Sequence, residues 1–354
     1  MTLQRPRPVI AGFSFAHHGR YSSFFRLMAY LEDCERYNLT PPIQRLIPKE
    51  YVRRWNYRWL KAGEWRLLPV YRRRAPQVIH YIYPENTLYR GIQWNKQHQL
   101  IATLHQPYDV LTGAEAPPWK DRLLEGLRRC QALVVLCASE VKPIRELTGV
   151  HDVSCIRHGI DTDFFRRIRP RDPAAPRLLT IGNWMRDWPT WAEAVRMIQA
   201  ARPEVEVDVI AEPYSHREAQ AAMGAGGRGI YYHTGLNDEQ FKAFYERASA
   251  LFLPLRSATA NNALLESMAM ALPVVLSDLS ALREYTGPDA GIYFPPGDAR
   301  AAAECVLRLL SDPAEQQRQG LHLRRQAETA LGWPAIASQY RALYRRHQEQ
   351  PAHA

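Results

Sequence analysis

The sequence predicts an α/β protein made of two doubly wound domains with parallel sheets. Short apolar runs alternate with helical patterns along the chain, and this alternation is typical of βα units. A segment rich in proline and arginine interrupts the alternation at residues 166–176, after which the pattern restarts. The 354 residues suffice for two ordinary domains. We therefore expect two similar domains that face a cleft.

The first half contains apolar runs that predict buried strands, with helical patterns between some of them. The predicted strands are residues 9–14, 78–82, 100–105, 132–137 and 153–156, and the predicted helices are 22–31 and 119–130. These elements define an N-terminal domain over residues 1–168.

The second half repeats this alternation. Strands are predicted at residues 178–181, 205–211, 229–233, 250–255, 274–277 and 291–294, and helices at 190–201, 238–249, 262–271 and 299–310. Two further helices are predicted at about 313–331 and 334–348. We expect a C-terminal domain over 177–332 and a closing segment over 333–354.

Composition narrows the class of protein. No run of 18 apolar residues is present, and the N-terminus lacks the pattern of a signal peptide. The five cysteines are scattered and none has CxxC spacing, which favours a reducing, cytoplasmic compartment. The net charge of +10 belongs to the first half: residues 1–170 carry 27 Lys/Arg and 15 Asp/Glu. That half is therefore expected to meet something anionic.

The most informative segment is residues 258–278, which predicts a polar loop, a short helix and a buried strand. The helix is largely apolar, yet Asn262 and Glu266 are four residues apart and share one face. A carboxylate on a core helix is costly unless a polar group meets it. Backbone N–H groups at the start of the helix favour an anion. Together these features indicate a nucleotide sugar, although a buried Glu266 that pairs with backbone N–H groups remains an alternative.

Residues 45–74 form a basic segment with interleaved aromatic residues, ten Lys/Arg against two Glu. Cations and tryptophans at helical spacing are typical of a helix at a membrane surface, which would place the protein at the inner face of the cytoplasmic membrane. An ordinary helix with its tryptophans in the core, a site for a phosphorylated acceptor, and a single-stranded nucleic-acid site are the other interpretations.

Four motifs agree in order and spacing with one known family. They are residues 102–107, a strand that ends at His105; 157–164, a glycine turn; 179–188, a strand that enters a glycine turn at Gly182; and 258–266. The sequence resembles the retaining GT-B glycosyltransferases of the large family-four type, found in bacterial polysaccharide and glycolipid synthesis. The resemblance extends from residue 100 to about 348, with weaker support before it.

The resemblance implies a GT-B fold, a nucleoside-diphosphate sugar as donor and predicted catalytic roles for His105 and Glu266. Glu266 matches the family's second Glu, which receives the ribose hydroxyls, and His105 matches a histidine close to the reacting sugar. The residues alone favour a capping or core histidine at position 105, and it is the resemblance that favours a role at the sugar. The helix that begins near Trp333 corresponds to one that crosses back to the N-terminal domain in the family.

The sequence departs from the family at three positions of the donor site. Asn183 stands where the family has Arg, Trp188 lies near the usual Lys, and Ala258 replaces the first Glu. Arg186 is then the nearby cation that we predict to contact phosphate, unless it is merely solvated. The remaining predicted donor-binding residues are Gly182, Asn183, Thr259, Asn261 and Asn262, of which Thr259, Asn261 and Asn262 could replace the lost Glu with neutral hydrogen bonds.

The loop after the first strand contains Gly19 and Arg20, which the resemblance places in the cleft near donor or acceptor. Asp161 and Asp163 have the DxD spacing of metal-dependent glycosyltransferases, but the glycine turn of the family accounts for them. We expect no metal and no cofactor. No dinucleotide or NTPase motif is present.

We therefore expect a metal-independent retaining glycosyltransferase that uses a nucleotide sugar and a glycan or lipid-linked acceptor. The loss of three family residues motivates an alternative, a degenerate homologue that binds a ligand or a partner without catalysis. A nucleic-acid-binding protein is motivated by charge alone and leaves the element from Asn261 to Glu266 unexplained.

Overall fold

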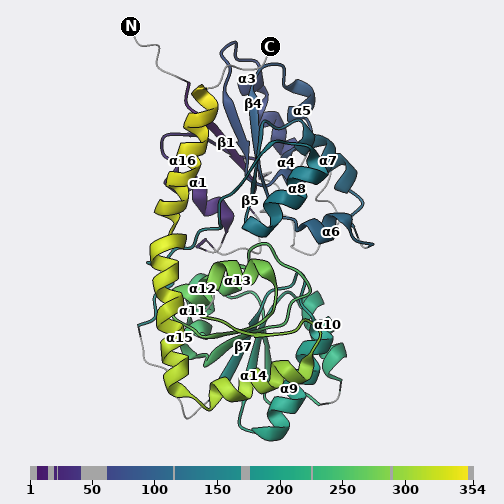
Figure 1. Ribbon diagram of the computed structural model, residues 1–354, viewed down its shortest axis with the longest axis vertical. Coiled ribbons are helices and arrows are strands. Elements are labelled where there is room, and N and C mark those ends of the chain that lie inside the picture. Colours follow the sequence, from purple (N-terminus) through teal and green to yellow (C-terminus); the bar gives the residue numbers. More distant parts are fainter. Residues whose placement is uncertain are drawn as a thin grey trace. The chain divides into compact units, whose positions relative to one another are not determined.

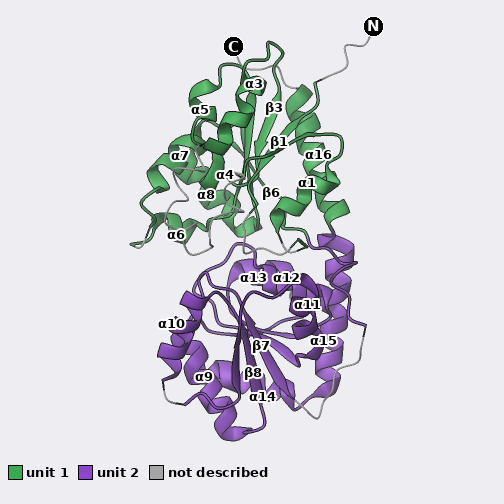
Figure 2. Cartoon of the chain, turned by 180° about the vertical axis from the view of Figure 1, so that it is seen from behind, with its two compact units in different colours: residues 1–159, 333–354 green, residues 160–332 purple. Residues whose placement is uncertain are grey.

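The structure is a computed structural model that describes residues 6–14, 20–21, 23–40, 62–114, 116–168, 176–224, 226–287 and 290–349. The chain forms two compact units (Figure 2). Unit 1 consists of Met1–Gly159 together with Trp333–Ala354, and unit 2 consists of Ile160–Gly332. Each unit is an α/β sandwich with one parallel sheet, as the sequence predicts.

Unit 1 contains a six-stranded sheet in the order β2-β1-β3-β4-β5-β6. Its strands are β1 (Val9–Gly12), β2 (Glu35–Asn38), β3 (Val78–Tyr81), β4 (Gln99–Leu104), β5 (Ala132–Val135) and β6 (Asp152–Cys155). Every neighbouring pair is parallel. Buried side chains fill β1, β3, β4 and β5, which is the pattern of strands covered on both faces.

The helices of unit 1 are short except near its end. They are η1 (Phe24–Arg26), α1 (Leu27–Tyr30), η3 (Glu64–Leu67), α3 (Leu68–Tyr71), α4 (Pro84–Thr87), α5 (Gly91–Trp94), α6 (Tyr108–Thr112), α7 (Lys120–Arg128), η4 (Ala138–Glu140), α8 (Val141–Thr148) and α16 (Trp333–Glu349). The last of these, α16, contacts α1 and β3 (Figure 1).

A buried polar network fastens α16 to the sheet of unit 1. His80 of β3 is fully buried and its two ring nitrogens bond the hydroxyls of Tyr344, at 2.6 Å, and Thr103, at 2.8 Å. Tyr340 of α16 bonds the same Thr103 hydroxyl at 3.0 Å and stacks on His80. Because buried polar groups cost free energy unless paired, these contacts fix the position of α16 on β3 and β4.

Unit 2 contains a second six-stranded parallel sheet, in the order β12-β11-β10-β7-β8-β9. Its strands are β7 (Arg177–Ile181), β8 (Glu206–Ile210), β9 (Ile230–His233), β10 (Ala250–Leu253), β11 (Val274–Ser277) and β12 (Ile292–Phe294). The chain runs outward from β7 through β8 to β9, then returns to the other side of β7 with β10. This order is that of the doubly wound dinucleotide-binding folds.

Helices cover both faces of this sheet (Figure 1). They are α9 (Trp188–Ala201), α10 (Pro213–Met223), α11 (Asp238–Arg247), α12 (Asn262–Ala269), α13 (Ser280–Thr286), α14 (Ala299–Leu310), α15 (Pro313–Gln326) and the π-helical turn η5 (Ala327–Leu331). The buried side chains of α9, α10 and α14 form one core with Val207 and Val209 of β8. The opposite face carries α11 and α12, and α15 packs on α12.

Side-chain caps fix where three helices of unit 2 begin. Asn237 accepts a bond from the N–H of Gln240 and forms a capping box with it at the start of α11. Asp298 and Asp312 accept N–H groups in the first turns of α14 and α15. Each cap satisfies a donor that the helix leaves unpaired, so each start lies at a polar residue visible in the sequence.

Most predicted elements are confirmed, and the misses have physical causes. The predicted strands of both halves are present with ends shifted by a few residues. β2 was not predicted, because partly buried and exposed residues alternate in this edge strand and it has no continuous apolar run. α10 was not predicted either, because its sequence is mostly polar residues and alanine. Among the described residues, no helix has the length and apolar character needed to cross a membrane.

Candidate functional site

The loops after β7 and β10 leave the carboxyl edge of the unit 2 sheet side by side. The two strands are neighbours in the sheet. After β7 the chain continues to β8 in one direction of the strand order, and after β10 it continues to β11 in the other direction. Asp187 N–H donates to the Pro254 carbonyl at 3.1 Å, and Arg256 N–H donates to the Met185 carbonyl at 3.0 Å. In open parallel sheets, ligands bind at the carboxyl edge at this kind of switch point.

Arg186 places a buried positive charge in the loop after β7. Its side chain is 8% exposed and donates to the carbonyl of Ile181, at 2.7 Å from Nε, and to that of Trp184, at 2.9 Å from Nη1. Burial lowers the pKa of Arg186 to about 10, against the opposing effects of Tyr245 and Tyr214. Among the described residues, Arg186 forms no ion pair with a carboxylate. A buried cation without a counter-charge is costly, so the site is suited to an anion.

Gly182 gives the guanidinium of Arg186 its space. The backbone of Gly182 has φ of 101°, and a Cβ added there would overlap with Nη2 of Arg186. Nη2 also donates to the Ile181 carbonyl. Glycine is therefore required for both the backbone conformation and the close approach of the side chain.

Asn183, predicted to bind the donor, has a structural hydrogen bond in this structure. Its Oδ1 accepts the N–H of Glu212 at 2.6 Å, and Glu212 follows β8. The side chain thus joins the loop after β7 to the loop after β8. Trp188 lies at the buried start of α9, where its Nε1 donates to Ser215 at 3.2 Å. It contributes to the core and supplies no cation.

The start of α12 lies at the end of the loop that follows β10. Asn261 is the N-cap residue, and its Oδ1 accepts the N–H of Leu264 at 3.2 Å. Asn262 and Ala263 open the helix, and no acceptor in the described part of the chain meets their backbone N–H groups. Such N–H groups, aligned with the helix dipole, attract an anion. Thr259 is buried in the loop just before.

Glu266 lies one turn into α12 and is 1% exposed. One of its carboxylate oxygens accepts a hydrogen bond from the hydroxyl of Tyr245, a fully buried residue of α11. Burial and the Glu266 charge raise the pKa of Tyr245 well above its usual value, while Arg186 opposes this shift. Arg186, Tyr245 and Glu266 therefore belong to one electrostatic group. Tyr245 is not among the predicted site residues, because nothing in the sequence around it indicates a bond to Glu266.

His105 lies in unit 1, directly after β4. Its Nε2 bonds the carbonyl of Ile82 at 2.8 Å, so the proton is assigned to Nε2. The ring stacks on Tyr83 with centroids 4.3 Å apart and meets the edge of Phe24 at 4.8 Å. Burial, and secondarily His158, lower the pKa of His105 to about 3. The ring is therefore neutral at pH 7 and suited to hydrogen bonding.

The loop after β1 provides the residues predicted at the acceptor side. Gly19 lies outside the described residues. Arg20 is exposed and lies over the ring of Tyr21, 5.7 Å from its centroid. This loop leaves the sheet of unit 1 at the switch point between β1 and β3.

The basic segment 45–74 is described only from residue 62 onward. The described part folds as η3 and α3, which bury Leu67, Val70 and Tyr71. Trp65 is 49% exposed, contacts Trp94 and has Arg90 over its ring at 5.0 Å. The other two tryptophans of the segment lie outside the described residues.

The DxD-like pair forms part of a turn. Asp161 is buried and its Oδ1 accepts the N–H of Phe164 at 3.0 Å. Arg324 of α15 donates to the carbonyls of Thr162, at 3.0 Å, and Phe165, at 2.7 Å. Across the described residues, no group of three or more His, Cys, Asp or Glu side chains could hold a metal ion.

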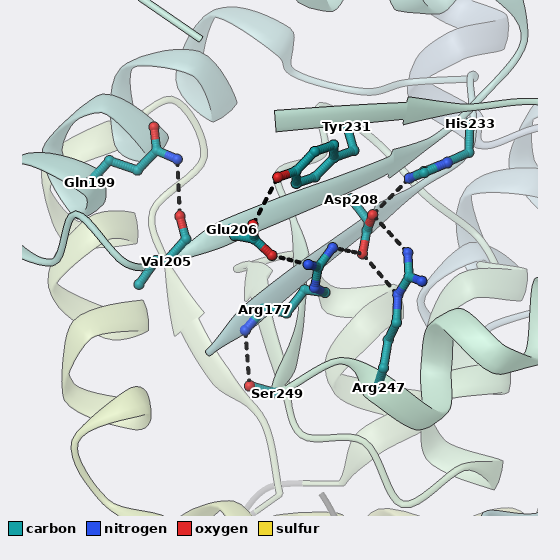
Figure 3. Close-up of polar contacts among 9 residues, drawn as sticks. All are labelled: Arg177, Gln199, Val205, Glu206, Asp208, Tyr231, His233, Arg247 and Ser249. Carbon is teal, nitrogen blue, oxygen red and sulfur yellow. Dashed lines mark hydrogen bonds and ion pairs between the residues drawn. The ribbon is translucent and has the colours of Figure 1, made fainter. Parts of the chain in front are cut away.

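A second cluster of charges in unit 2 is fully paired (Figure 3). Asp208 of β8, 1% exposed, accepts from Arg177 at 3.0 Å, from Arg247 at 2.9 Å and from His233 at 2.7 Å. Arg177 also pairs with Glu206, and both residues begin their strands. Arg177 and Glu206 begin β7 and β8, whereas the loop that carries Arg186 follows the last residue of β7. The charges of the cluster compensate one another, which indicates a structural role.

Comparisons with known proteins show which family the chain resembles. A family model described as "Glycosyltransferase Family 4" matches residues 25–164, and one described as "Glycosyl transferases group 1" matches residues 175–312. The chain is 27% identical over 273 residues to an MMP alpha-(1->4)-mannosyltransferase of Mycolicibacterium hassiacum. That match covers 69% of this chain and 64% of the relative's length.

Solved structures share the fold. A sucrose-phosphate synthase from Thermosynechococcus elongatus superposes with a TM-score of 0.73 and 19% identity, over 96% of this chain and 99% of that one. A trehalose 6-phosphate synthase from Burkholderia multivorans gives a TM-score of 0.70 and 12% identity, over 97% and 99%. At these identities the likeness concerns the fold alone.

Proposed function

Because this chain belongs to the family-four type of GT-B glycosyltransferases, we propose that it transfers a sugar from a nucleoside-diphosphate sugar to a glycan or lipid-linked acceptor. This proposal rests chiefly on Arg186. It is a buried cation at the switch point of a doubly wound sheet, without a carboxylate partner among the described residues, and a diphosphate would supply the missing negative charge.

The donor is proposed to bind in unit 2 along the loops after β7 and β10. Arg186 and the N–H groups of Asn262 and Ala263 hold the diphosphate, because both sources of positive charge lack an anion in the described chain. Glu266, one helical turn further, accepts hydrogen bonds from the ribose hydroxyls. The hydroxyl of Tyr245 donates a hydrogen bond to one of the carboxylate oxygens of Glu266.

The reaction is proposed to retain the configuration of the sugar. The bond between the anomeric carbon and the diphosphate breaks through an oxocarbenium-like state, and an acceptor hydroxyl forms its bond to that carbon on the same face. The leaving phosphate, on which negative charge grows, takes the proton of the acceptor hydroxyl. Arg186 and the aligned amides stabilise that charge, which is the largest contribution that a preorganised site makes to such a step. In other glycosyltransferases a metal ion supplies this charge, and we propose that here the arginine and the amides replace it.

His105 is proposed to hydrogen-bond the donor sugar. The buried ring stays neutral at pH 7, so it contributes a directed hydrogen bond and no charge. Its Nε2 proton is engaged with Ile82, which fixes the orientation of the ring. The name of the mannosyltransferase relative supports a hexosyl donor. The basic segment 45–74, with the exposed Trp65 at its described end, supports an acceptor at an anionic lipid surface.

A two-stage assay tests the proposal. Melting temperatures are measured with UDP, GDP, dTDP and CMP compounds, since a ligand that binds the folded chain raises its apparent stability by mass action. Sugar donors of the stabilising base are then incubated with the protein, and the anomeric configuration of the released or transferred sugar is read by NMR. Binding followed by release with retention supports the proposal. Binding without turnover of any donor would favour the non-catalytic alternative, and absence of nucleotide binding would contradict the proposed donor site.

A further inference from the structure

Glu85 is a buried carboxyl group that none of the predicted site motifs includes. It lies on α4, which two residues separate from β3, and its side chain is 5% exposed. Its Oε1 accepts the backbone N–H of His105 at 2.6 Å. The parallel register aligns Tyr81 with Ala102, so the residues that follow both strands meet at the same edge of the unit 1 sheet.

The second oxygen of Glu85 has no such contact. Oε2 is buried and meets no hydrogen-bond partner among the described residues. Most buried polar atoms are paired, so an unpaired carboxylate oxygen calls for a physical explanation. A proton on this carboxyl group provides one, because a neutral acid is much less costly to bury than an anion.

The neighbours of Glu85 leave it without a full counter-charge. From α7, Arg122 donates to the backbone carbonyls of Glu85, at 3.0 Å, and Leu88, at 2.9 Å, and lies over the ring of Tyr89. From the end of β4, His105 contributes a neutral ring. Tyr83, just before α4, is a further titratable neighbour, and burial raises its pKa.

We propose that Glu85 is a positioning residue for His105. Its carboxyl group accepts the backbone N–H of His105 in the turn after β4, and this hydrogen bond becomes stronger when the carboxyl group loses its proton. A carboxylate accepts a backbone N–H more strongly than a neutral acid does, so ionisation strengthens the bond to His105. The positioning rests on contacts within unit 1. Its effect on sugar transfer rests on the proposed function, in which His105 contacts the donor sugar.

The Glu85 carboxyl group ionises in a pH range that experiments can cover without acid that would unfold the protein. Burial raises the pKa of Glu85 to about 7, against the lowering effects of the backbone hydrogen bonds, including that from His105, and of Arg122. We therefore expect the bond to His105 to strengthen as the pH rises through neutrality.

The backbone amide of His105 reports this directly and needs no enzymatic activity. In the full-length, isotopically labelled protein, the amide proton shift of His105 is followed by NMR from pH 5.5 to 8.5. We expect a step in the wild-type chain, which the neutral isostere Glu85→Gln removes. Glu140→Gln is the matched control, since Glu140 accepts the N–H of Tyr108 at 2.8 Å in the neighbouring loop and its replacement should leave the step intact. A wild-type titration without a step, or a step that persists in Glu85→Gln, overturns the proposal.

The pH dependence of sugar transfer tests the consequence. With a donor found in the screen above, kcat should rise through neutrality in the wild type and in Glu140→Gln, with KM for the donor unchanged. In Glu85→Gln we expect the rise to be absent and kcat at pH 8 to be lower by about tenfold, because loss of positioning costs rate. Loss of the amide step without any change in the kcat profile would overturn the link to catalysis. If no donor is turned over, the proposed function fails while the NMR titration still decides on Glu85.

Discussion

Gly182 and Arg186 interlock in the loop after β7, where the guanidinium of Arg186 occupies the space that a Cβ on Gly182 would need. The contact holds the arginine against the carbonyls of Ile181 and Trp184 and keeps its charge at the edge of the sheet. Met185 reaches this arrangement with φ of 57°. The position of the cation therefore depends on a glycine as well as on the arginine itself.

Replacing Gly182 by alanine should displace Arg186 and weaken nucleotide binding about tenfold. The added methyl group overlaps with Nη2, and φ of 101° is strained for a residue with a Cβ, at a cost of roughly 1–3 kcal/mol. Gly297→Ala is the control, because Gly297 has φ of 83° and nothing within 4 Å of its added Cβ. Calorimetric titration with the stabilising nucleotide compares the two. Equal nucleotide affinities in the two variants would show that Gly182 does not contribute to the binding site.

Glu266 should discriminate nucleotides by their ribose hydroxyls. Removal of a hydrogen bond to a charged acceptor costs about 1.5–3 kcal/mol, so the wild type should bind a 2′,3′-dideoxy nucleotide at least about tenfold more weakly than its parent. In Glu266→Gln this difference should shrink, while Glu239→Gln, an exposed residue of α11, should retain it. Affinities of both nucleotides for the three proteins give the coupling. An unchanged ratio in Glu266→Gln would contradict a contact between this carboxylate and the ribose.

Asp208 should be essential to the stability of unit 2. Its carboxylate accepts hydrogen bonds from Arg177, Arg247 and His233, and loss of hydrogen bonds to a buried charged group costs about 1.5–3 kcal/mol. Asp208→Asn should lower the free energy of unfolding in urea by that order. Asp278→Asn, which breaks an exposed pair with Arg283, should cost less than about 1 kcal/mol. Similar losses in both variants would show that the cluster in Figure 3 is no more stabilising than a surface pair.

Mild acid should destabilise unit 1 through its buried histidines. Burial lowers the pKa of His80 and of His105 to about 3 and that of His158 to about 4. Below pH 6.5 the unfolded chain binds protons that the folded chain excludes, so stability falls as the pH drops from 6.5 toward 3. Hydrogen exchange at pH 7 and 4.5, corrected for the intrinsic rates, should show protection lost in β3 and β4.

The exposed His151 provides the control for this effect. Its replacement by Gln should leave the acid-dependent loss of protection unchanged. Greater loss in β7 and β8 of unit 2 than in β3 and β4 would contradict the assignment to the buried histidines.

The sequence was informative where burial alone decides structure. The continuous apolar runs at β4 and β10 and the polar cap Asn261 before α12 are local signals, so strands, helix start and the position of Glu266 could be predicted. The π-helical turn at Ala327–Leu331 and the edge strand β2 have no such local signature. Their conformations follow from packing against neighbours.

Contacts between residues distant in sequence were the part that could not be predicted. Glu85 meets His105 because β3 and β4 pair in a particular register, and Tyr245 meets Glu266 because α11 and α12 lie on one face of the sheet. The burial of Arg186 likewise depends on a sharp backbone reversal at Met185. A carboxyl group just after a predicted strand, as at Glu85, is the one sequence signal that could have drawn attention to that position.

The central claim is that unit 2 holds a nucleoside diphosphate through Arg186, and calorimetric titration of UDP and GDP tests it most directly. We expect at least one of the two nucleotides to bind the wild type. The control variant Arg217→Met, which replaces an exposed arginine of α10, should bind this nucleotide with the same affinity. Arg186→Met should bind it about tenfold or more weakly, since a charge-assisted contact with phosphate is lost. Undiminished binding by Arg186→Met, or no binding of either nucleotide to the wild type, would contradict the account.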